Sequence, residues 1–203
     1  MSDLTAGKEL IATGMRQEKQ RCQEALHRAS EGAVVALISS GDPGIYGMAG
    51  LAIEMAAAGQ FSTPIEIVPG VSAAQAAAAR LGAPLALDYA CVSLSDLLVP
   101  WDTIRSRLEA AAQGDFVTAL YNPRSMRRVR QLEAAVEIFK RHRPASTPAG
   151  IVTAAGAEGE RTVITTLDQV LEQEIGMRTV VIIGNSTSRC NSAWLVTPRG
   201  YRL

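Results

Sequence analysis

The sequence predicts an α/β protein in which short apolar strands alternate with helices. Apolar runs of four to seven residues recur along the chain, and several are followed by turn residues and then by apolar residues at helical spacing. The first run, Ala33–Ser39, is rich in Val and Ile and becomes polar only at its end. Such a run is typical of a strand that is buried on both faces of a sheet.

The first predicted strand, turn and helix occupy residues 33–58. Ser40–Gly44 breaks the apolar run with Gly, Asp and Pro, and apolar residues then return at helical spacing. The same order follows in the strand Ile65–Val68, the turn Pro69–Gly70 and an Ala-rich helix from Ser72 to Leu81. Both turns are expected at the carboxyl ends of neighbouring strands, where ligands bind in open α/β sheets.

A polar helix precedes the first strand, and the alternation restarts after a connector in Gly82–Asp88. The remaining expected elements are helix Arg16–Ser30, strand Ala90–Leu94, helix Trp101–Ala112, strand Asp115–Leu120, helix Arg124–Arg141, strands Pro148–Thr153, Arg161–Thr165 and Thr179–Ile183, and a closing hairpin arm in Trp194–Tyr201. The connector predicts a boundary near residues 84–89, between an N-terminal α/β domain in residues 1–85 and a C-terminal α/β domain in residues 90–203.

Composition and charge favour a cytoplasmic globular protein. Hydrophobic residues make up 47% of the chain, charged residues make up 20%, and the formal net charge is zero, so nothing points to nucleic acid or to an anionic membrane surface. No apolar run is long enough to cross a bilayer, and no signal peptide opens the chain. Cys22, Cys91 and Cys190 are far apart, as is typical of reduced thiols, and His27 and His142 lack companion ligands, so no metal site is expected.

The turn after Ala33–Ser39 is acidic, because it carries Asp42 and neither Lys nor Arg. A glycine-rich loop at the start of a helix often binds phosphate, but a carboxylate with no neighbouring cation disfavours a polyphosphate. A small molecule that bears hydroxyl groups or a positive charge suits this loop better. A plain strand-to-helix turn fits the same residues equally well.

Four motifs follow one another in the chain in a characteristic order. They are S-G-D-P-G-I-Y-G-M-A (40–49), V-P-G-V-S-A (68–73), L-S-D-L-L-V-P-W (94–101) and L-Y-N-P-R-S (120–125). Together they resemble the tetrapyrrole methylase family, over nearly the whole chain. The last two are most similar to members that methylate C17 of precorrin-3B or cobalt-precorrin-3, with ring contraction, in cobalamin biosynthesis. The resemblance implies two consecutive α/β domains with S-adenosylmethionine in the cleft between them, a tetrapyrrole substrate and a homodimer.

The resemblance also implies which loop residues bind S-adenosylmethionine. They are Gly41, Asp42, Tyr46, Ser72, Ala73, Leu120, Tyr121, Asn122, Thr153 and Ala154. The chemistry agrees for Asp42, because a carboxylate can accept hydrogen bonds from ribose hydroxyls or from the amino group. Backbone groups at Gly41 and Ala73 can bind the adenine edge. Ser72 can equally be the N-cap of its helix, and the two roles are compatible.

The expected chemistry needs few catalytic side chains. In methyl transfer from a sulfonium, most of the task is to hold the acceptor carbon and the methyl group in line. A base must still accept a proton, and the ring contraction needs a polarised ring hydroxyl. Ser95, Asp96 and Tyr121 are the candidate catalytic residues. Asp96 can instead cap the helix that begins at Trp101.

Basic residues follow the Tyr-Asn-Pro loop. A tetrapyrrole of this class carries many carboxylates, and Arg binds carboxylates bidentately. Arg124 adjoins the loop and is the candidate for binding the substrate. Arg127, Arg128 and Arg130 better fit a solvated helix face.

The resemblance fails at one point. Family members begin with a strand and a G-x-G-P-G loop, and no residue of this sequence matches either. Because that strand lies inside the family's N-terminal sheet, its loss would expose two strand edges. We therefore expect this chain to be less stable, and slower in methyl transfer, than a version that carries the strand and the loop. Equal behaviour would mean that another segment, Met1–Thr13, supplies the strand.

Two further classes of function stay open. A non-catalytic tetrapyrrole-binding or partner subunit fits the missing loop, and measurable methyl transfer would exclude it. A different nucleotide-binding α/β enzyme, such as a dehydrogenase, is disfavoured because no G-x-G-x-x-G motif follows a strand. Comparing the binding of S-adenosylhomocysteine with that of NAD separates these possibilities.

Overall fold

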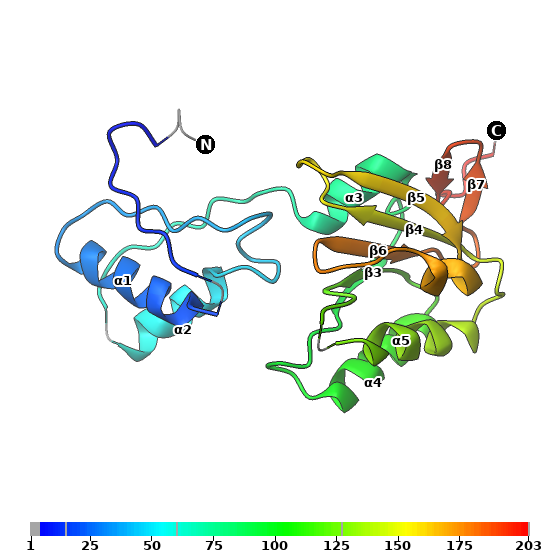
Figure 1. Ribbon diagram of the computed structural model, residues 1–203, viewed down its shortest axis with the longest axis horizontal. Coiled ribbons are helices and arrows are strands. Elements are labelled where there is room, and N and C mark those ends of the chain that lie inside the picture. Colours follow the sequence, from blue (N-terminus) through cyan, green and yellow to red (C-terminus); the bar gives the residue numbers. More distant parts are fainter. Residues whose placement is uncertain (1–4, 15, 60, 127, 203) are drawn as a thin grey trace. The chain divides into compact units, whose positions relative to one another are not determined.

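The computed structural model describes residues 5–14, 16–59, 61–126 and 128–202, which belong to two compact units (Figure 1). The first unit is Met1–Gly70 and the second is Val71–Leu203. This division lies earlier than the boundary that the connector predicts near residues 84–89. The reason is packing, since α3 (Ala73–Leu81) buries its small side chains against strands of the second unit.

The second unit is built on a five-stranded sheet in the order β2-β3-β6-β4-β5 (Figure 1). The sheet is mixed: β2 and β3 are parallel, β6 is antiparallel to both β3 and β4, and β5 is antiparallel to β4. The bounds are β2 Tyr89–Ser93, β3 Val117–Tyr121, β4 Pro148–Thr153, β5 Arg161–Thr166 and β6 Thr179–Ile183. Each of the five strands that the sequence predicts here is confirmed.

Helices cover both faces of this sheet. On one face lie α4 (Trp101–Gln113), α5 (Arg130–Lys140) and the 3-10 helix η2 (Leu167–Glu172), and α3 lies on the other (Figure 1). Alternation along β3 divides its side chains between the two cores, because Leu120 packs with α4 and α5 whereas Ala119 and Tyr121 pack with α3. The helix η2 is not predicted from the sequence.

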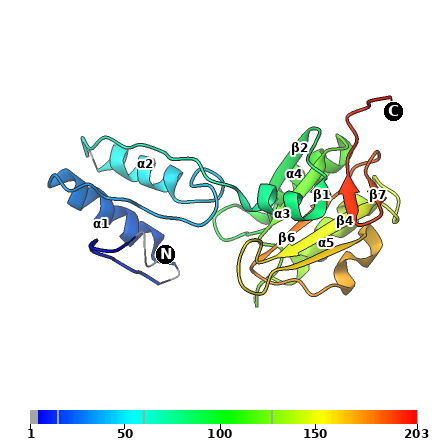
Figure 2. The ribbon, with the colours of Figure 1, turned by 90° about the horizontal axis from the view of Figure 1, so that it is seen from above.

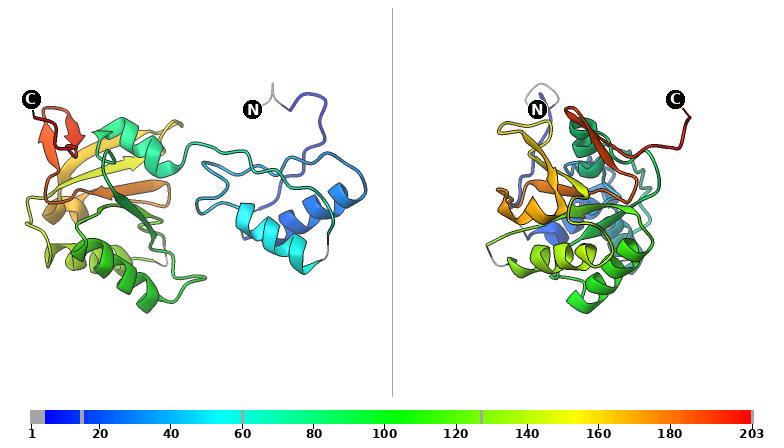
Figure 3. Two further views of the ribbon diagram at one scale, coloured as in Figure 1. Left: turned by 180° about the vertical axis from the view of Figure 1, so that it is seen from behind. Right: turned by 90° about the vertical axis from the view of Figure 1, so that its right-hand side faces the viewer.

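A small second sheet holds the end of the chain (Figure 3). Its strands are β1 (Gly82–Ala83), β8 (Trp194–Val196) and β7 (Arg189–Asn191), with β8 parallel to β1 and antiparallel to β7. The predicted hairpin arm thus forms only in its first residues. Gly82 has φ +125°, and a Cβ there would lie 2.9 Å from the Leu195 carbonyl oxygen, so the connection from α3 requires glycine.

The helix predicted over Arg124–Arg141 begins later, at Arg130. A turn occupies the residues before it, because the Ser125 N–H donates to the Arg128 carbonyl oxygen and the Arg128 N–H donates to Ser125 Oγ. Serine side chains often compete with the helix for backbone groups in this way. Arg124 and Arg128 therefore lie in a loop, whereas Arg127 falls outside the described residues.

The described residues of the first unit form two helices, α1 (Glu18–Ser30) and α2 (Ala49–Ala58), which lie side by side (Figure 2). The strands predicted at Ala33–Ser39 and Ile65–Val68 are wrong, since neither segment forms a strand. A strand needs a hydrogen-bonded neighbour about 4.8 Å away. Within the described part of the chain, no backbone–backbone hydrogen bond joins residues 34–39 or 65–68 to another segment.

A buried arginine holds the second unit together. The Arg143 guanidinium donates to the carbonyl oxygens of Phe116 (2.7 Å), Ala111 (3.4 Å) and Gly184, and it lies 4.7 Å from the centre of the Phe139 ring. These partners come from the end of α4, the start of β3, the end of β6 and α5. The Arg143 side chain thus contacts four elements of the second unit and connects them.

We expect Arg143→Met to lower the free energy of unfolding by about 3 kcal/mol, because it removes the three buried hydrogen bonds from the guanidinium to those carbonyl oxygens. Urea denaturation of the purified chain measures this loss. The matched control is Arg141→Met, whose exposed side chain pairs with Glu109 and should change stability by only about 0.5 kcal/mol. Equal losses in the two variants would contradict the structural role of Arg143.

Candidate functional site

Three strand ends meet at one edge of the five-stranded sheet. Because β2 and β3 are parallel, and β3 and β4 are both antiparallel to β6, the carboxyl ends of β2, β3 and β4 point the same way. These ends are Ser93, Tyr121 and Thr153. The predicted residues Tyr121, Asn122, Thr153 and Ala154 therefore gather at one edge, which we call the carboxyl edge. Ligands of open α/β sheets bind at edges of this kind.

The backbone is strained at this edge. Asn122 and Ala154 each follow a strand directly, and each has φ 51°, in the left-handed region. Asn tolerates this conformation, but Ala does so at a cost of roughly 1–3 kcal/mol. Strain of this kind concentrates at binding and catalytic sites, where the surrounding structure maintains it.

Side-chain hydrogen bonds fix the carboxyl edge between neighbouring strands. Asn122 Nδ2 donates to Ser93 Oγ at 3.0 Å, and the hydroxyls of Thr153 and Thr179 lie 2.8 Å apart. Ser93 and Thr179 are not among the residues predicted from the sequence. Ser93 immediately precedes the L-S-D-L-L motif. Its position at the end of a strand could have identified it from the sequence as a candidate site residue.

The N-terminus of α3 is joined to the carboxyl edge. Ser72 caps α3 in a reciprocal capping box with Gln75, which confirms the N-cap alternative for this residue. Ala73 is the first residue of the helix, and the Ala74 N–H donates to the Tyr121 hydroxyl at 2.8 Å. The candidate cofactor residues Ser72 and Ala73 thus share one contact network with Tyr121.

Tyr121 has a structural task as well as its candidate catalytic one. Its ring is buried with α3, and burial raises the pKa of its hydroxyl above the usual value, although hydrogen bonds to Ser72 and Ala74 act in the opposite direction. The hydroxyl therefore stays protonated at neutral pH. It is better suited to hold the α3 N-terminus than to accept a proton.

The two other candidate catalytic residues lie in the loop after β2. The Ser95 N–H donates to Ser93 Oγ at 3.2 Å, and Asp96 is exposed and accepts a 2.8 Å bond from Gln131 Nε2 on α5. The expectation that Asp96 caps the following helix is wrong, because α4 has Pro100 at its N-cap and no side-chain cap. Because a carboxylate can accept several hydrogen bonds, the exposed Asp96 side chain can accept others besides the one from Gln131.

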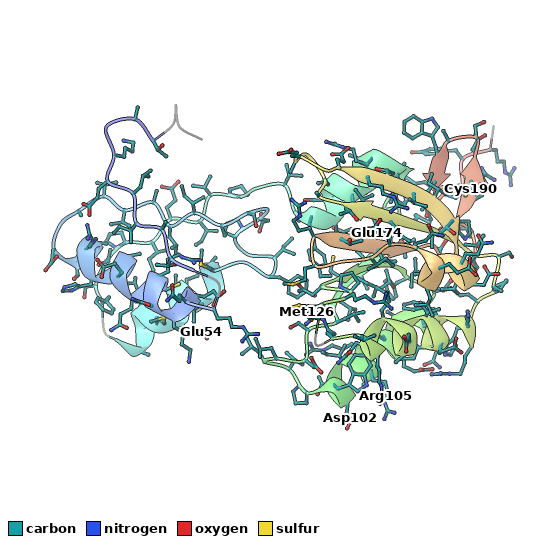
Figure 4. All side chains as sticks on the ribbon, viewed as in Figure 1. Glu54, Asp102, Arg105, Met126, Glu174 and Cys190 are labelled. Atoms are coloured by element: carbon teal, nitrogen blue, oxygen red, sulfur yellow. The ribbon has the colours of Figure 1, made fainter. Side chains whose placement is uncertain are left out.

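Arg124 lies in the loop after β3. Its Nη2 is 4.0 Å from Glu133 Oε1, at the limit of an ion pair, and its buried Nε has no hydrogen-bond acceptor among the described residues. Arg128, in contrast, donates from Nε to the Asn122 carbonyl oxygen at 2.8 Å and braces the loop. Met126 of the same loop is almost fully exposed (Figure 4). Arg124 thus has only a weak ion pair within the protein. The assignment of Arg128 to a solvated helix face is wrong, because it lies in the loop before α5 and its Nε donates to the Asn122 carbonyl oxygen, which makes it a positioning residue.

The Leu120 side chain does not lie at the carboxyl edge. It is fully buried in the core that β3 shares with α4 and α5. Only its backbone is placed near the end of the strand. Any contact of Leu120 with a ligand would therefore be a main-chain contact.

The remaining predicted residues, Gly41, Asp42 and Tyr46, belong to the acidic loop of the first unit. Asp42 accepts from the Gly44 N–H at 2.8 Å through Oδ1 and from the Gly70 N–H at 3.0 Å through Oδ2. These backbone donors, first Gly70 and then Gly44, lower the pKa of Asp42. Gly41 and Tyr46 have φ 76° and 55°, and the Tyr46 side chain is exposed. Asp42 therefore ties together the two turns that the sequence predicts at strand ends.

Among the described residues, no group of three or more His, Cys, Asp or Glu could hold a metal ion. In the same part of the chain, no helix is both long enough and apolar enough to cross a membrane.

Comparison with known families identifies the fold. The family model for Tetrapyrrole (Corrin/Porphyrin) Methylases matches residues 4–171. The chain belongs to the tetrapyrrole methylase family. This methylase superposes on the crystal structure of the methyltransferase CobJ with a TM-score of 0.89 and 37% identity, over 95% of this chain and 82% of that chain. The cobalt precorrin-4 methyltransferase CbiF, at a TM-score of 0.65 and 23% identity, shares the fold.

Named relatives are similar over nearly the whole methylase chain. It is 44% identical over 199 residues to the probable cobalt-factor III C(17)-methyltransferase of Salmonella typhimurium, with 98% of this chain and 83% of the relative covered. The precorrin-3B C(17)-methyltransferase of Sinorhizobium sp is 43% identical, over 88% of this chain and 72% of the relative. The cobalt-factor III methyltransferase of Priestia megaterium is 45% identical, but the chain spans only 38% of its length.

We expect Tyr121→Phe to lower the free energy of unfolding by about 1–2 kcal/mol, because the buried Ala74 N–H loses its acceptor. Chemical denaturation measures the loss. Tyr201→Phe is the matched control, since this ring is 75% exposed, and it should leave stability nearly unchanged. A stability equal to that of the unmodified chain would show that the hydroxyl is free for another role.

The lowered pKa of Asp42 predicts an acid-dependent loss of stability. Because the folded pKa lies below the ordinary 3.8, this contribution is present above about pH 4 and is lost as the pH falls through the folded pKa. Asp42→Asn should therefore flatten the fall in melting temperature below about pH 4. Asp102→Asn, at an exposed position on α4 (Figure 4), should keep the profile of the original chain. Identical profiles for all three proteins would contradict the role of Asp42.

Proposed function

We propose that this chain is an S-adenosylmethionine-dependent methyltransferase that methylates C17 of cobalt-factor III or precorrin-3B, with ring contraction, in cobalamin biosynthesis. The observation that carries the proposal is the 44% identity to the Salmonella relative, which is named for C17 methylation and is covered over 83% of its length. The likeness to CobJ at 37% identity supports the same class of reaction.

The carboxyl edge fits the proposed methyl donor. S-adenosylmethionine supplies a methyl group on a sulfonium, which is already a good leaving group. The chain would hold the donor beside Asn122 and Ala154, which follow the strand ends with φ 51°, and through the Thr153 hydroxyl. A uroporphyrin-III C-methyltransferase of the same fold was crystallised with S-adenosyl homocysteine. Gly41, Asp42, Tyr46, Ser72, Ala73, Leu120 and Tyr121 stay in the proposed cofactor set.

Asp96 is the proposed proton acceptor. Its carboxylate is exposed, and the 2.8 Å bond from Gln131 orients it without neutralising its charge. Ser95 is the proposed hydrogen-bond donor to the ring hydroxyl, since its N–H already donates to Ser93 and its hydroxyl has no hydrogen-bond partner among the described residues. Tyr121 contributes by positioning α3 and the start of the loop after β3.

Arg124 is the proposed partner of a substrate carboxylate. A bidentate pair with a carboxylate would supply the acceptor that Arg124 Nε lacks among the described residues. Glu133, 4.0 Å away, keeps the guanidinium near the loop but makes no close ion pair with it. The arrangement suits a side chain that exchanges a weak internal partner for a stronger one on the ligand.

A non-catalytic tetrapyrrole-binding or partner subunit is the second candidate. The observation that favours it is the first unit, whose described residues form α1 and α2 but no strand. Without a sheet, the loops of such a unit are positioned less rigidly. We further propose that the chain acts in the cytoplasm as a homodimer, and light scattering of the purified chain tests the assembly.

The direct test is methyl transfer by the purified chain. We expect a labelled methyl group to pass from S-adenosylmethionine to C17 of cobalt-factor III or precorrin-3B, with the product identified by mass spectrometry and NMR. Calorimetry with S-adenosylhomocysteine serves as the separate binding test. Binding without transfer would favour the non-catalytic subunit, and failure of both would overturn the assignment for this form of the chain.

We expect Arg124→Ala to raise the Michaelis constant for the tetrapyrrole by about tenfold, corresponding to one lost charged pair of about 1.4 kcal/mol. Binding of S-adenosylhomocysteine should not change. Arg130→Ala is the matched control, because Arg130 is exposed at the first residue of α5 and should leave both constants unaltered. Equal weakening of both ligands in Arg124→Ala would reassign the residue to the cofactor site or to a structural role.

A further inference from the structure

The loop after β4, residues 154–160, contains two consecutive tight turns. The Ala157 N–H donates to the Ala154 carbonyl oxygen at 2.9 Å, and the Glu160 N–H donates to the Ala157 carbonyl oxygen at 3.2 Å. Glu160 is the last residue before β5, and its side chain turns back to accept a hydrogen bond from the Gly156 N–H. The Glu160 carboxylate therefore connects the end of the loop with its middle.

Arg80 of α3 binds the same carboxylate from outside the loop. Its Nε donates to both oxygens of Glu160, at 2.9 Å and 3.1 Å, although the two residues are 80 positions apart in the sequence. A Cβ on Gly156 would lie 3.8 Å from Arg80 Nη2, so the guanidinium lies directly against the loop. Ala155 packs on the core that α3 forms with the sheet. The loop after β4 is thus joined to α3 by a polar contact and by an apolar one.

The helix α3 connects two parts of the carboxyl edge. At its N-terminus the Ala74 N–H donates to the hydroxyl of Tyr121, the last residue of β3. In its last turn Arg80 reaches the loop after β4, and β6 lies between β3 and β4 in the sheet. Small buried side chains such as Ala77 pack on the sheet between these two contacts. The helix therefore braces the edge from the end of β3 to the end of β4.

We propose that Arg80 and Glu160 are positioning residues for the methyl donor. Their ion pair fixes the loop after β4 against α3, and the loop in turn holds Ala154 in its left-handed conformation beside the Thr153 hydroxyl. The inference rests on the proposed function, because it concerns the same ligand at the carboxyl edge. It adds two residues that act through the loop and not through contact with the ligand.

The ion pair acts on the local conformation of the loop more than on overall stability. The side chains of Arg80 and Glu160 are 41% and 32% exposed, and exposed pairs contribute little to the free energy of unfolding. An alanine with positive φ, in contrast, persists only where its surroundings maintain it. The hydrogen bonds from Arg80 and then from the Gly156 N–H lower the pKa of Glu160, so its carboxylate is ionised at neutral pH and keeps both partners.

Hydrogen exchange of the free chain tests the contact without any ligand. Arg80→Met should speed amide exchange in residues 154–160 by about fivefold or more, because the loop opens more often, while the melting temperature changes little. Arg80→Lys should restore slow exchange to within about twofold, since a single nitrogen makes both contacts and a lysine ammonium can replace it. Arg105→Met is the matched control, because Arg105 is an exposed arginine that pairs with Asp102 on α4 (Figure 4), and it should leave this exchange unchanged. Unchanged exchange in Arg80→Met would overturn the inference.

Calorimetry with S-adenosylhomocysteine tests the link to the cofactor. Arg80→Met and Glu160→Gln should each raise the dissociation constant by about fivefold, because the binding loop is less preorganised. Since both changes remove one shared interaction, the double variant should bind no more weakly than the weaker single variant. Additive losses, or an unchanged constant in Arg80→Met, would overturn the inference and leave the proposed function in place. Absence of binding by the original chain would instead overturn the proposed function, and with it the ligand assigned to this loop.

Discussion

Hydrogen bonding between neighbouring strands is the constraint on which this structure depends. In the second unit every strand of the five-stranded sheet has at least one partner, and helices bury both faces. In the first unit, residues 34–39 and 65–68 have comparably apolar sequences but no hydrogen-bonded strand partner among the described residues, and they have no secondary structure. The difference lies in pairing, because the backbone groups of a strand are satisfied only by another strand.

The direction of the strands decides where functional residues gather. Since β2, β3 and β4 end at one edge, polar groups that are distant in the sequence become neighbours there, as Ser93 and Asn122 do. Tyr121 extends this network to α3, whose N-terminus is also fixed by the Ser72 capping box. The strained backbone at Asn122 and Ala154 is held by this surrounding framework.

The sequence predicts the second unit well and the first unit poorly. The strand Pro148–Thr153 is found at its predicted bounds, because its apolar run has partners on both sides. The strand Ala33–Ser39 fails although its pattern is as clear, since periodicity reports side-chain burial and not the presence of a neighbour. The start of α5 was misplaced for a local reason, the turn that Ser125 forms with Arg128.

The sequence by itself determined the α/β class, the order of elements in the second unit and the four motifs that identify the family, because turn residues and apolar periodicity are local properties of the chain. Only the tertiary structure decided how the candidate residues are used. It engages Asp42 with two backbone N–H groups, joins Asp96 to Gln131 and commits the Tyr121 hydroxyl to α3, while Arg124 keeps an unpaired Nε among the described residues. Apart from the Gly44 N–H, which lies two residues from Asp42, each of these outcomes depends on a partner that lies far away in the sequence or on its absence, and local pattern carries no information about such partners.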